Sequence, residues 1–209
     1  MIDRERNAAQ FVGSIVGVAV LPPWYDPSMR ILAISGSLRA VSSNTSLLRA
    51  AAILAPAGME IALYGGLGDL PHFNPDLEDA EPFPVTDLRR QVWEADGLLI
   101  SSPEYAHGVP GSLKNALDWL VGGSEIVAKP IALWNASPRA THAQESLAET
   151  LRTMSTRLVP EASIAVPLLA RGIDAAGIAA DPALVEPLHA ALAAFARAIA
   201  SLRQTASVP

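Results

Sequence analysis

The segment Ser35–Asn44 combines small, hydroxyl and cationic side chains that could hold an anion. Its candidate donors are the side chains of Ser37, Arg39, Ser42, Ser43 and Asn44. An apolar run precedes the segment and helix-forming residues follow it, so it ends at a helix N-terminus, where free N–H groups favour negative charge. It lacks the Gly-Lys-[Ser/Thr] ending of a Walker A loop, and it is not a GxGxxG fingerprint. The pattern predicts either a phosphate site or an ordinary strand-to-helix turn capped by Ser or Asn.

A second loop, Ser101–Gly111, has the composition of a stiff binding edge. Two prolines and two glycines restrict its shape, and Glu104, Tyr105 and His107 are its reactive side chains. Backbone amides beside an aromatic side chain suit a flat heteroaromatic ligand. For Tyr105 a role in packing or at an interface is favoured over catalysis, and for His107 a solvated side chain is favoured.

Composition excludes several other kinds of chemistry. The 209 residues carry a net charge of −6, which argues against a nucleic-acid partner. The absence of cysteine excludes a Cys nucleophile, a disulfide scaffold and Cys-ligated metal sites. The four histidines show no metal-binding spacing, so no metal is predicted, and the hydrolase motif GxSxG is absent. No apolar run reaches the length of a membrane span, and Phe11–Pro22 is a poor signal peptide, so we expect no membrane partner and a cytoplasmic location.

Short apolar runs alternate with segments of helical periodicity. The expected strands are Ile31–Ile34, Glu60–Leu63, Gly97–Ser102, Pro130–Asn135 and Ala162–Val166. The expected helices run from Asn44 to about Leu54, over Val85–Ala95, from an N-cap at Ser112, from about His142 to Leu158 and from about Leu184 to Leu202. A long loop, Tyr64–Pro84, lies between the second strand and the second helix.

This alternation predicts an α/β fold with a doubly wound, five-stranded parallel sheet. The flavodoxin-like strand order 2-1-3-4-5 fits best, with ligands beyond the carboxyl ends of strands 1 and 3. Both candidate loops fall at these ends. Because Met29 directly precedes the first strand, we expect one domain over residues 29–209 and a loosely attached extension over residues 1–28.

Three motifs resemble those of the NADPH-dependent FMN reductase family, the flavodoxin-like group that includes bacterial quinone, chromate and azo reductases. The first is Gly36-Ser-Leu-Arg-x-x-Ser-x-Asn44, and the second is Leu70-Pro-x-Phe-Asn-x-Asp76. The third runs from Pro103-Glu-Tyr105 through Gly108-x-Pro-Gly-x-Leu-Lys-Asn-Ala-Leu-Asp-Trp119. The resemblance covers about Met29 to Val166.

The resemblance implies non-covalently bound FMN. Its phosphate would lie on Ser37, Arg39, Ser42 and Asn44, and its isoalloxazine ring along Pro103, Glu104, Tyr105, Ala106, His107 and Gly108. The loop Ala136–Arg139, including Ser137, would close one side of the ring. NADPH or NADH would reduce the flavin at N5, and a quinone, flavin, azo compound or similar small molecule would then be reduced in a ping-pong scheme. No side chain needs to act as an acid or base.

Two departures from the family pattern keep alternatives open. Family members often have Asn at the position of Ala106, and many have a Gly-rich stretch where this chain has Ser137-Pro-Arg-Ala-Thr-His142. These departures keep open a scaffold that has lost flavin. A flavodoxin-type electron carrier, which binds FMN without oxidising NAD(P)H, is the other competing hypothesis. We also expect a homodimer or homotetramer in which a second subunit covers the flavin, because Leu70, Pro71 and Phe73 make the long loop too apolar for solvent.

Overall fold

The sheet has the predicted doubly wound topology. A computed structural model describes residues 29–168 and 172–206. The predicted extension over residues 1–28, with the poor signal peptide inside it, lies outside these ranges. The strand order is β2-β1-β3-β4-β5, all pairs are parallel, and β6 also pairs with β4. The strands are β1 (Met29–Ser35), β2 (Met59–Leu63), β3 (Gly97–Ser101), β4 (Pro130–Asn135), β5 (Arg157–Leu158) and β6 (Ile164–Ala165).

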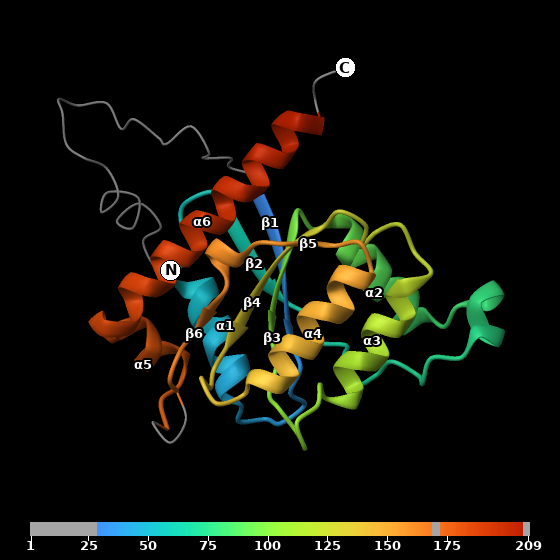
Figure 1. Ribbon diagram of the computed structural model, residues 1–209, viewed down its shortest axis with the longest axis horizontal. Helices are drawn as coiled ribbons and strands as arrows, with labels where there is room; N and C mark the ends of the chain where they lie inside the picture. Colours follow the sequence, from blue (N-terminus) through green and yellow to red (C-terminus); the bar gives the residue numbers. More distant parts are fainter. Residues whose placement is uncertain (1–28, 169–171, 207–209) are drawn as a thin grey trace.

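Helices cover both faces of the sheet, as Figure 1 shows. One face carries α1 (Ser43–Ile53), α5 (Ala175–Ala180) and α6 (Pro182–Ala206), and the other carries α2 (Phe83–Glu94), α3 (Gly111–Val121) and α4 (Thr141–Thr153). Every residue of β3 and β4 is buried. Strands buried on both faces need continuous apolar runs, which is why GLLIS and PIALWN could be recognised in the sequence.

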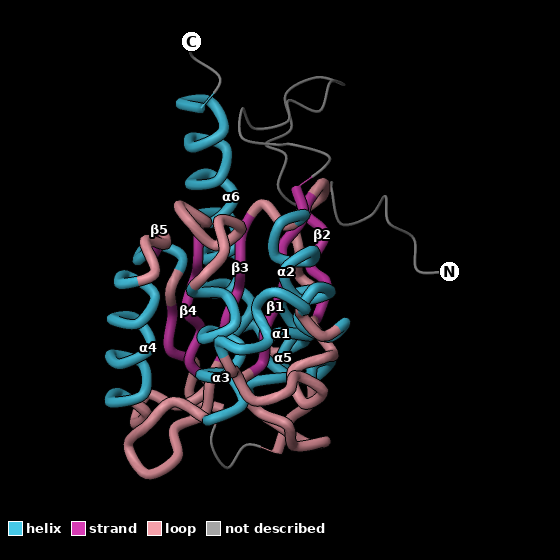
Figure 2. Tube along the Cα trace, turned by 90° about the vertical axis from the view of Figure 1, so that its right-hand side faces the viewer, coloured by secondary structure: helices cyan, strands magenta, loops and turns pink. Residues whose placement is uncertain are grey.

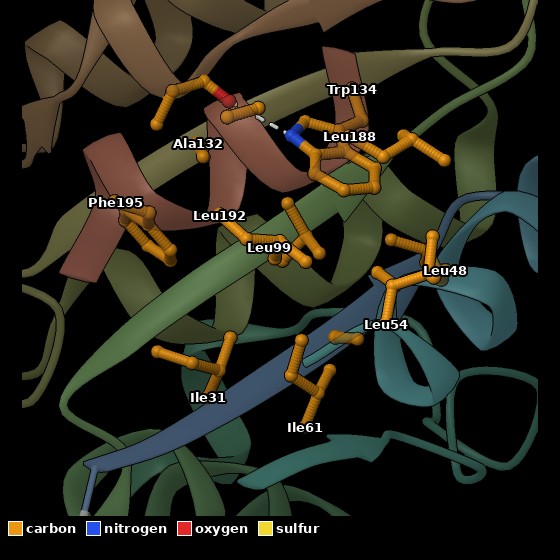
Figure 3. Packing of buried hydrophobic residues seen from close by; sticks show 14 of the residues in the cluster. Ile31, Leu48, Leu54, Ile61, Leu99, Ala132, Trp134, Leu188, Leu192 and Phe195 are labelled. Atoms are coloured by element: carbon orange, nitrogen blue, oxygen red, sulfur yellow. Dashed lines mark hydrogen bonds between the residues drawn. The ribbon is translucent and has the colours of Figure 1, made fainter. Parts of the chain in front are cut away.

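Side chains alternate between two hydrophobic clusters on opposite faces of the sheet. Ile31 and Leu99 contact the α1 and α6 side, while their neighbours Leu32 and Leu98 contact the α2 and α3 side. Figure 3 shows Phe195, Leu188 and Leu192 of α6 among the residues that pack on the first face. Trp134 is also buried there, and its indole N–H donates to the carbonyl oxygen of Ala162 at 2.8 Å.

The predicted end of α4 is wrong by five residues. Ser155 adopts a left-handed conformation (φ 58°), and its N–H donates to Arg152 O while the N–H of Thr156 donates to Leu151 O. This is a Schellman motif, which ends the helix without the usual glycine. The chain then forms β5 at once, so Leu158 belongs to a strand.

Other predicted boundaries also need correction. The predicted fifth strand, Ala162–Val166, is replaced by β5, a 3₁₀ turn (Pro160–Ala162) and the short β6. Helix α3 begins at Gly111 after Pro110, and no side chain caps it, so Ser112 is not the N-cap. The six-residue α5 was not predicted, because its Ala-rich sequence is too short to show periodicity.

Helix α6 is long and apolar enough to pass a length and composition test for a membrane span. Its apolar side chains, including Leu188 and Phe195, lie instead in the core against the sheet. Burial inside the fold therefore accounts for its hydrophobicity.

The amino ends of the strands are held by charged side chains that have partners. Asp96 accepts from the backbone N–H of Arg30 at 2.7 Å and pairs with Arg203 of α6 at 2.6 Å. Arg89 pairs with Glu81 and with the buried Glu125. Nearby, the Lys129 ammonium donates to the carbonyl oxygen of Ala95, and burial lowers the pKa of this lysine.

Candidate functional site

A cavity of about 370 Å³ lies at the carboxyl ends of β1, β3 and β4. Figure 2 shows the loops that follow these strands gathered at the lower edge of the molecule. Nine of the residues singled out in the sequence line it, namely Ser37, Arg39, Ser42, Ser43, Asn44, Pro103, Glu104, Tyr105 and Ser137. Ala106, His107 and Gly108 do not line it but form the turn beside it.

The first loop leaves the sheet close to β3. The N–H of Gly36 donates to the carbonyl oxygen of Ser101 at 2.8 Å, continuing the ladder between β1 and β3 by one residue. A Cβ at Gly36 would lie 2.8 Å from the Oγ of Ser102 and 3.2 Å from its Cα. Glycine is therefore required for this close approach, which brings the following hydroxyl residues to the cavity.

Several side chains of this loop have hydrogen-bond donors that their contacts among the described residues do not use. The buried Oδ1 of Asn44 accepts from the hydroxyl of Ser101 at 2.8 Å, and its Nδ2 amide has no partner among the described residues. Ser42 caps α1 by accepting from the N–H of Thr45. Its own hydroxyl hydrogen is then available to a ligand. Ser37 likewise accepts from the N–H of Arg39.

The loop after β3 contains a strained two-residue turn. Tyr105 and Gly108 exchange both backbone hydrogen bonds, at 3.1 and 2.9 Å. Ala106 and His107 between them have φ values of 50° and 61°. This is the geometry of a type I′ turn, in which Asn and Gly are strongly preferred. The resemblance noted above often places Asn at the position of Ala106, and a left-handed backbone accounts for that preference without a side-chain contact to a ligand.

Glu104 connects the loop after β3 to the element after β4. Its Oε2 accepts from the N–H of Ala143 in the first turn of α4 at 2.9 Å. Its Oε1 lies 3.3 Å from Nδ1 of His107, and the ring of His107 meets that of His142 edge to face at 4.3 Å between centroids. The N-cap residue of α4, Ala140, has no side chain to cap the helix.

The loop after β4 is organised by Asn135. Its Oδ1 accepts from the N–H of Ser137 at 2.8 Å, and its Nδ2 donates to the carbonyl oxygen of Ala140 at 2.9 Å. Asn135, Ala140 and Ser102 line the cavity but were not proposed from the sequence. The signal for Asn135 was a polar residue at the end of the apolar run PIALWN.

The cavity carries more positive than negative charge. Arg39 and Arg139 both line it, and neither forms an ion pair within residues 29–168 and 172–206. Glu104 is the one carboxylate among the lining residues, and it is engaged with α4. The arrangement therefore suits an anionic group.

The apolar part of the long loop packs within this chain. Leu70 is buried, and Phe73 meets Trp119 of α3 edge to face at 5.1 Å. Asn115 accepts from the N–H of Phe73 and donates to the carbonyl oxygen of Pro71, which also accepts from the indole of Trp119. We expected a second subunit to cover these residues because they would otherwise face solvent. That premise is wrong, since α3 of the same chain covers them.

Comparisons with known proteins identify a family and several relatives that are reductases. Residues 29–169 match the NADPH-dependent FMN reductase family. An NAD(P)H-dependent FMN reductase of Pseudomonas aeruginosa is 35% identical over 156 residues, which cover 71% of this chain and 83% of that protein. A quinone reductase of Escherichia coli K12 is 36% identical over 113 residues, but these cover only 52% of this chain and 60% of the relative.

A solved structure has the same fold. The flavoenzyme NAD(P)H:(acceptor) oxidoreductase FerB from Paracoccus denitrificans superposes with a TM-score of 0.73 at 31% identity. The superposition covers 83% of this chain and 98% of the other.

Proposed function

Since this chain belongs to the NADPH-dependent FMN reductase family, we propose that it is an NAD(P)H-dependent oxidoreductase that holds FMN in the cavity at the carboxyl ends of β1, β3 and β4. Residues 29–209 would form its FMN-binding domain, with residues 1–28 as an extension. The observation that carries the proposal is the convergence of three loops on one cavity, where hydroxyl and amide donors lie beside Arg39.

The donor chemistry of the first loop fits a phosphate. The hydroxyl of Ser42, the Nδ2 of Asn44 and the guanidinium of Arg39 can all donate, and the free N–H groups of α1 add to them. Gly36 provides space, because a side chain there would collide with Ser102. We therefore assign the FMN phosphate to this loop, with Ser37 and Ser43 as its further hydroxyls.

The isoalloxazine ring fits between the other two loops. The cavity is lined by Pro103, Glu104 and Tyr105 from the loop after β3 and by Ala136, Ser137 and Arg139 from the loop after β4. Ala106, His107 and Gly108 form the turn beside it. When bound, FMN supplies the redox chemistry, taking hydride from NAD(P)H and passing electrons to an acceptor. The chain's own contribution is to bind and orient the flavin.

The proposed acceptor is a small molecule such as a quinone, a flavin or an azo compound. Quinone reductases among the relatives support this class, and fold alone does not select one member of it. We propose a cytoplasmic location, in keeping with an NAD(P)H-dependent enzyme.

We also propose a homodimer or homotetramer, now on a different observation. Leu38, Val41 and Tyr105 lie on the loops that line the cavity and are 61%, 81% and 53% exposed. Large apolar side chains around a binding site favour contact with another surface. Light scattering after size exclusion measures the mass, and a monomer at micromolar concentration would contradict this proposal.

The visible spectrum of the protein tests the function directly. The protein is mixed with FMN, freed of excess and then treated anaerobically with NADPH. A bound flavin band that bleaches within seconds is expected for the reductase. A band that persists would indicate a carrier reduced by another protein, and the absence of any band after FMN addition would contradict flavin binding.

A further inference from the structure

We propose that Glu104 is a positioning residue that ties together the two loops on either side of the flavin ring. The inference rests on the proposed FMN site but concerns a contact that the protein makes without ligand. The tie is the hydrogen bond from the N–H of Ala143 to Oε2 of Glu104, between residues 39 positions apart.

The carboxylate of Glu104, in the loop after β3, caps the N-terminus of α4. The first N–H groups of a helix lack partners within the helix, and Ala140 at the N-cap position offers no side-chain acceptor. A carboxylate at a helix N-terminus is also favoured by the helix dipole. The side chain of Glu104 is only 14% exposed, which limits competition from water for this bond.

The tie spans the place where the ring would lie. Glu104 lies between Pro103 and the strained turn Tyr105–Gly108, while Ala143 lies in the first turn of α4, which follows the loop that contains Arg139 and Ala140. Fixing one loop to the other therefore sets the width of the gap between them. The contact between His107 and His142 joins the same two elements a second time, further towards solvent.

Loss of the tie is expected to reduce the fraction of molecules in which the gap fits the ring. A cap of this kind commonly biases its helix end by a factor of about five to ten, and apparent affinity falls with the fraction of competent protein. Glu104→Ala should therefore weaken FMN binding, by at most about five- to tenfold. The loss should affect contacts to the ring and not those to the phosphate. Riboflavin, which has the ring but no phosphate, should therefore lose affinity by the same factor.

Two variants separate this role from others. Glu104→Gln keeps an oxygen acceptor for the N–H of Ala143, and it should bind FMN within about twofold of the parent protein. Glu145→Ala removes an exposed carboxylate from the same helix and leaves both loops unchanged. It controls for a general change of charge near α4.

The experiment measures FMN and riboflavin affinity by flavin fluorescence, together with amide hydrogen exchange of the ligand-free protein. Glu104→Ala is expected to speed amide exchange at Ala143 and to weaken the binding of FMN and of riboflavin by the same factor. Both effects should be smaller in Glu104→Gln and in Glu145→Ala. An unchanged FMN affinity in Glu104→Ala, or a loss in Glu104→Gln as large as that in Glu104→Ala, would overturn the proposal. If the parent protein itself binds no FMN, the proposed function fails, while exchange at Ala143 still tests the tie.

Discussion

The two ends of the sheet use charge in opposite ways. At the amino ends, Asp96 is bound to Arg203 and to the N–H of Arg30, and Arg89 lies between two glutamates. At the carboxyl ends, Arg39 and Arg139 line a cavity without an ion pair in the described part of the chain. Paired charges can stabilise a fold, whereas unpaired cations beside free donors are suited to a ligand. Variants at the two ends should therefore affect different measurements.

The largest effect is expected from Arg39→Ala. Loss of a charge-assisted hydrogen bond to the phosphate should weaken FMN binding by about 10- to 100-fold, with little change in riboflavin binding. The thermal stability of the ligand-free protein should stay the same, because Arg39 is exposed and makes no ion pair. Flavin fluorescence titration measures both affinities. Arg49→Ala, which removes an exposed arginine from α1, is the control for charge, and equal FMN binding by both variants would contradict the assignment.

Asp96→Ala should show the opposite behaviour at the other end. It leaves the N–H of Arg30 and the guanidinium of Arg203 without this acceptor, so the free energy of unfolding should fall by about 1–2 kcal/mol. FMN affinity should not change. Urea denaturation measures the loss, and Asp96→Asn, which keeps one acceptor, should recover part of it. A weaker FMN affinity in Asp96→Ala would mean that the two ends are coupled.

The parts of the molecule that could be predicted from the sequence are those governed by local pattern. The buried strands β3 and β4 read as apolar runs, and the motif from Pro103 to Trp119 identified the family. The end of α4 could not be predicted, because its stop is a Ser in a position where Gly is usual. The role of the Glu104 side chain also escaped prediction, since its partner lies 39 residues away.

A smaller effect is expected from relieving backbone strain at either end of the sheet. Ala106 near the cavity and Ser155 after α4 both have left-handed backbone conformations. Replacing either with Gly should raise the free energy of unfolding by about 0.5–1 kcal/mol, because Gly carries no Cβ penalty there. Only Ala106→Gly should also alter FMN affinity. Equal effects of both variants on FMN binding, or a loss of stability in either, would contradict this distinction.

The smallest effect is a pH dependence at the amino ends. Burial lowers the pKa of Lys129, so between that value and its ordinary pKa the unfolded chain binds more protons and stability rises with pH. As the pH rises towards the ordinary pKa of lysine, the parent protein should gain stability relative to Lys129→Met. Burial raises the pKa of Tyr64 to about 12, which lowers stability with pH in both proteins and cancels in the difference. Urea denaturation at several pH values measures the free energy of unfolding of both proteins. A difference between the two proteins that does not change with pH would contradict the expectation.

The way in which α3 holds the long loop has a consequence for engineering. Asn115 and Trp119 fix the chain at Pro71 and Phe73, but the 3₁₀ turn that follows, η2 (Pro75–Ala80), has no buried residue and stands away from the body at the right of Figure 1. Leu77 packs against the core, whereas Asp79 and Ala80 are exposed. A foreign peptide or a small reporter domain inserted between Asp79 and Ala80 would therefore leave both the core and the cavity in place. The same fold could thus carry a cargo of added sequence at η2, whereas even one residue inserted between Pro71 and Phe73 would break the hydrogen bonds that secure the loop.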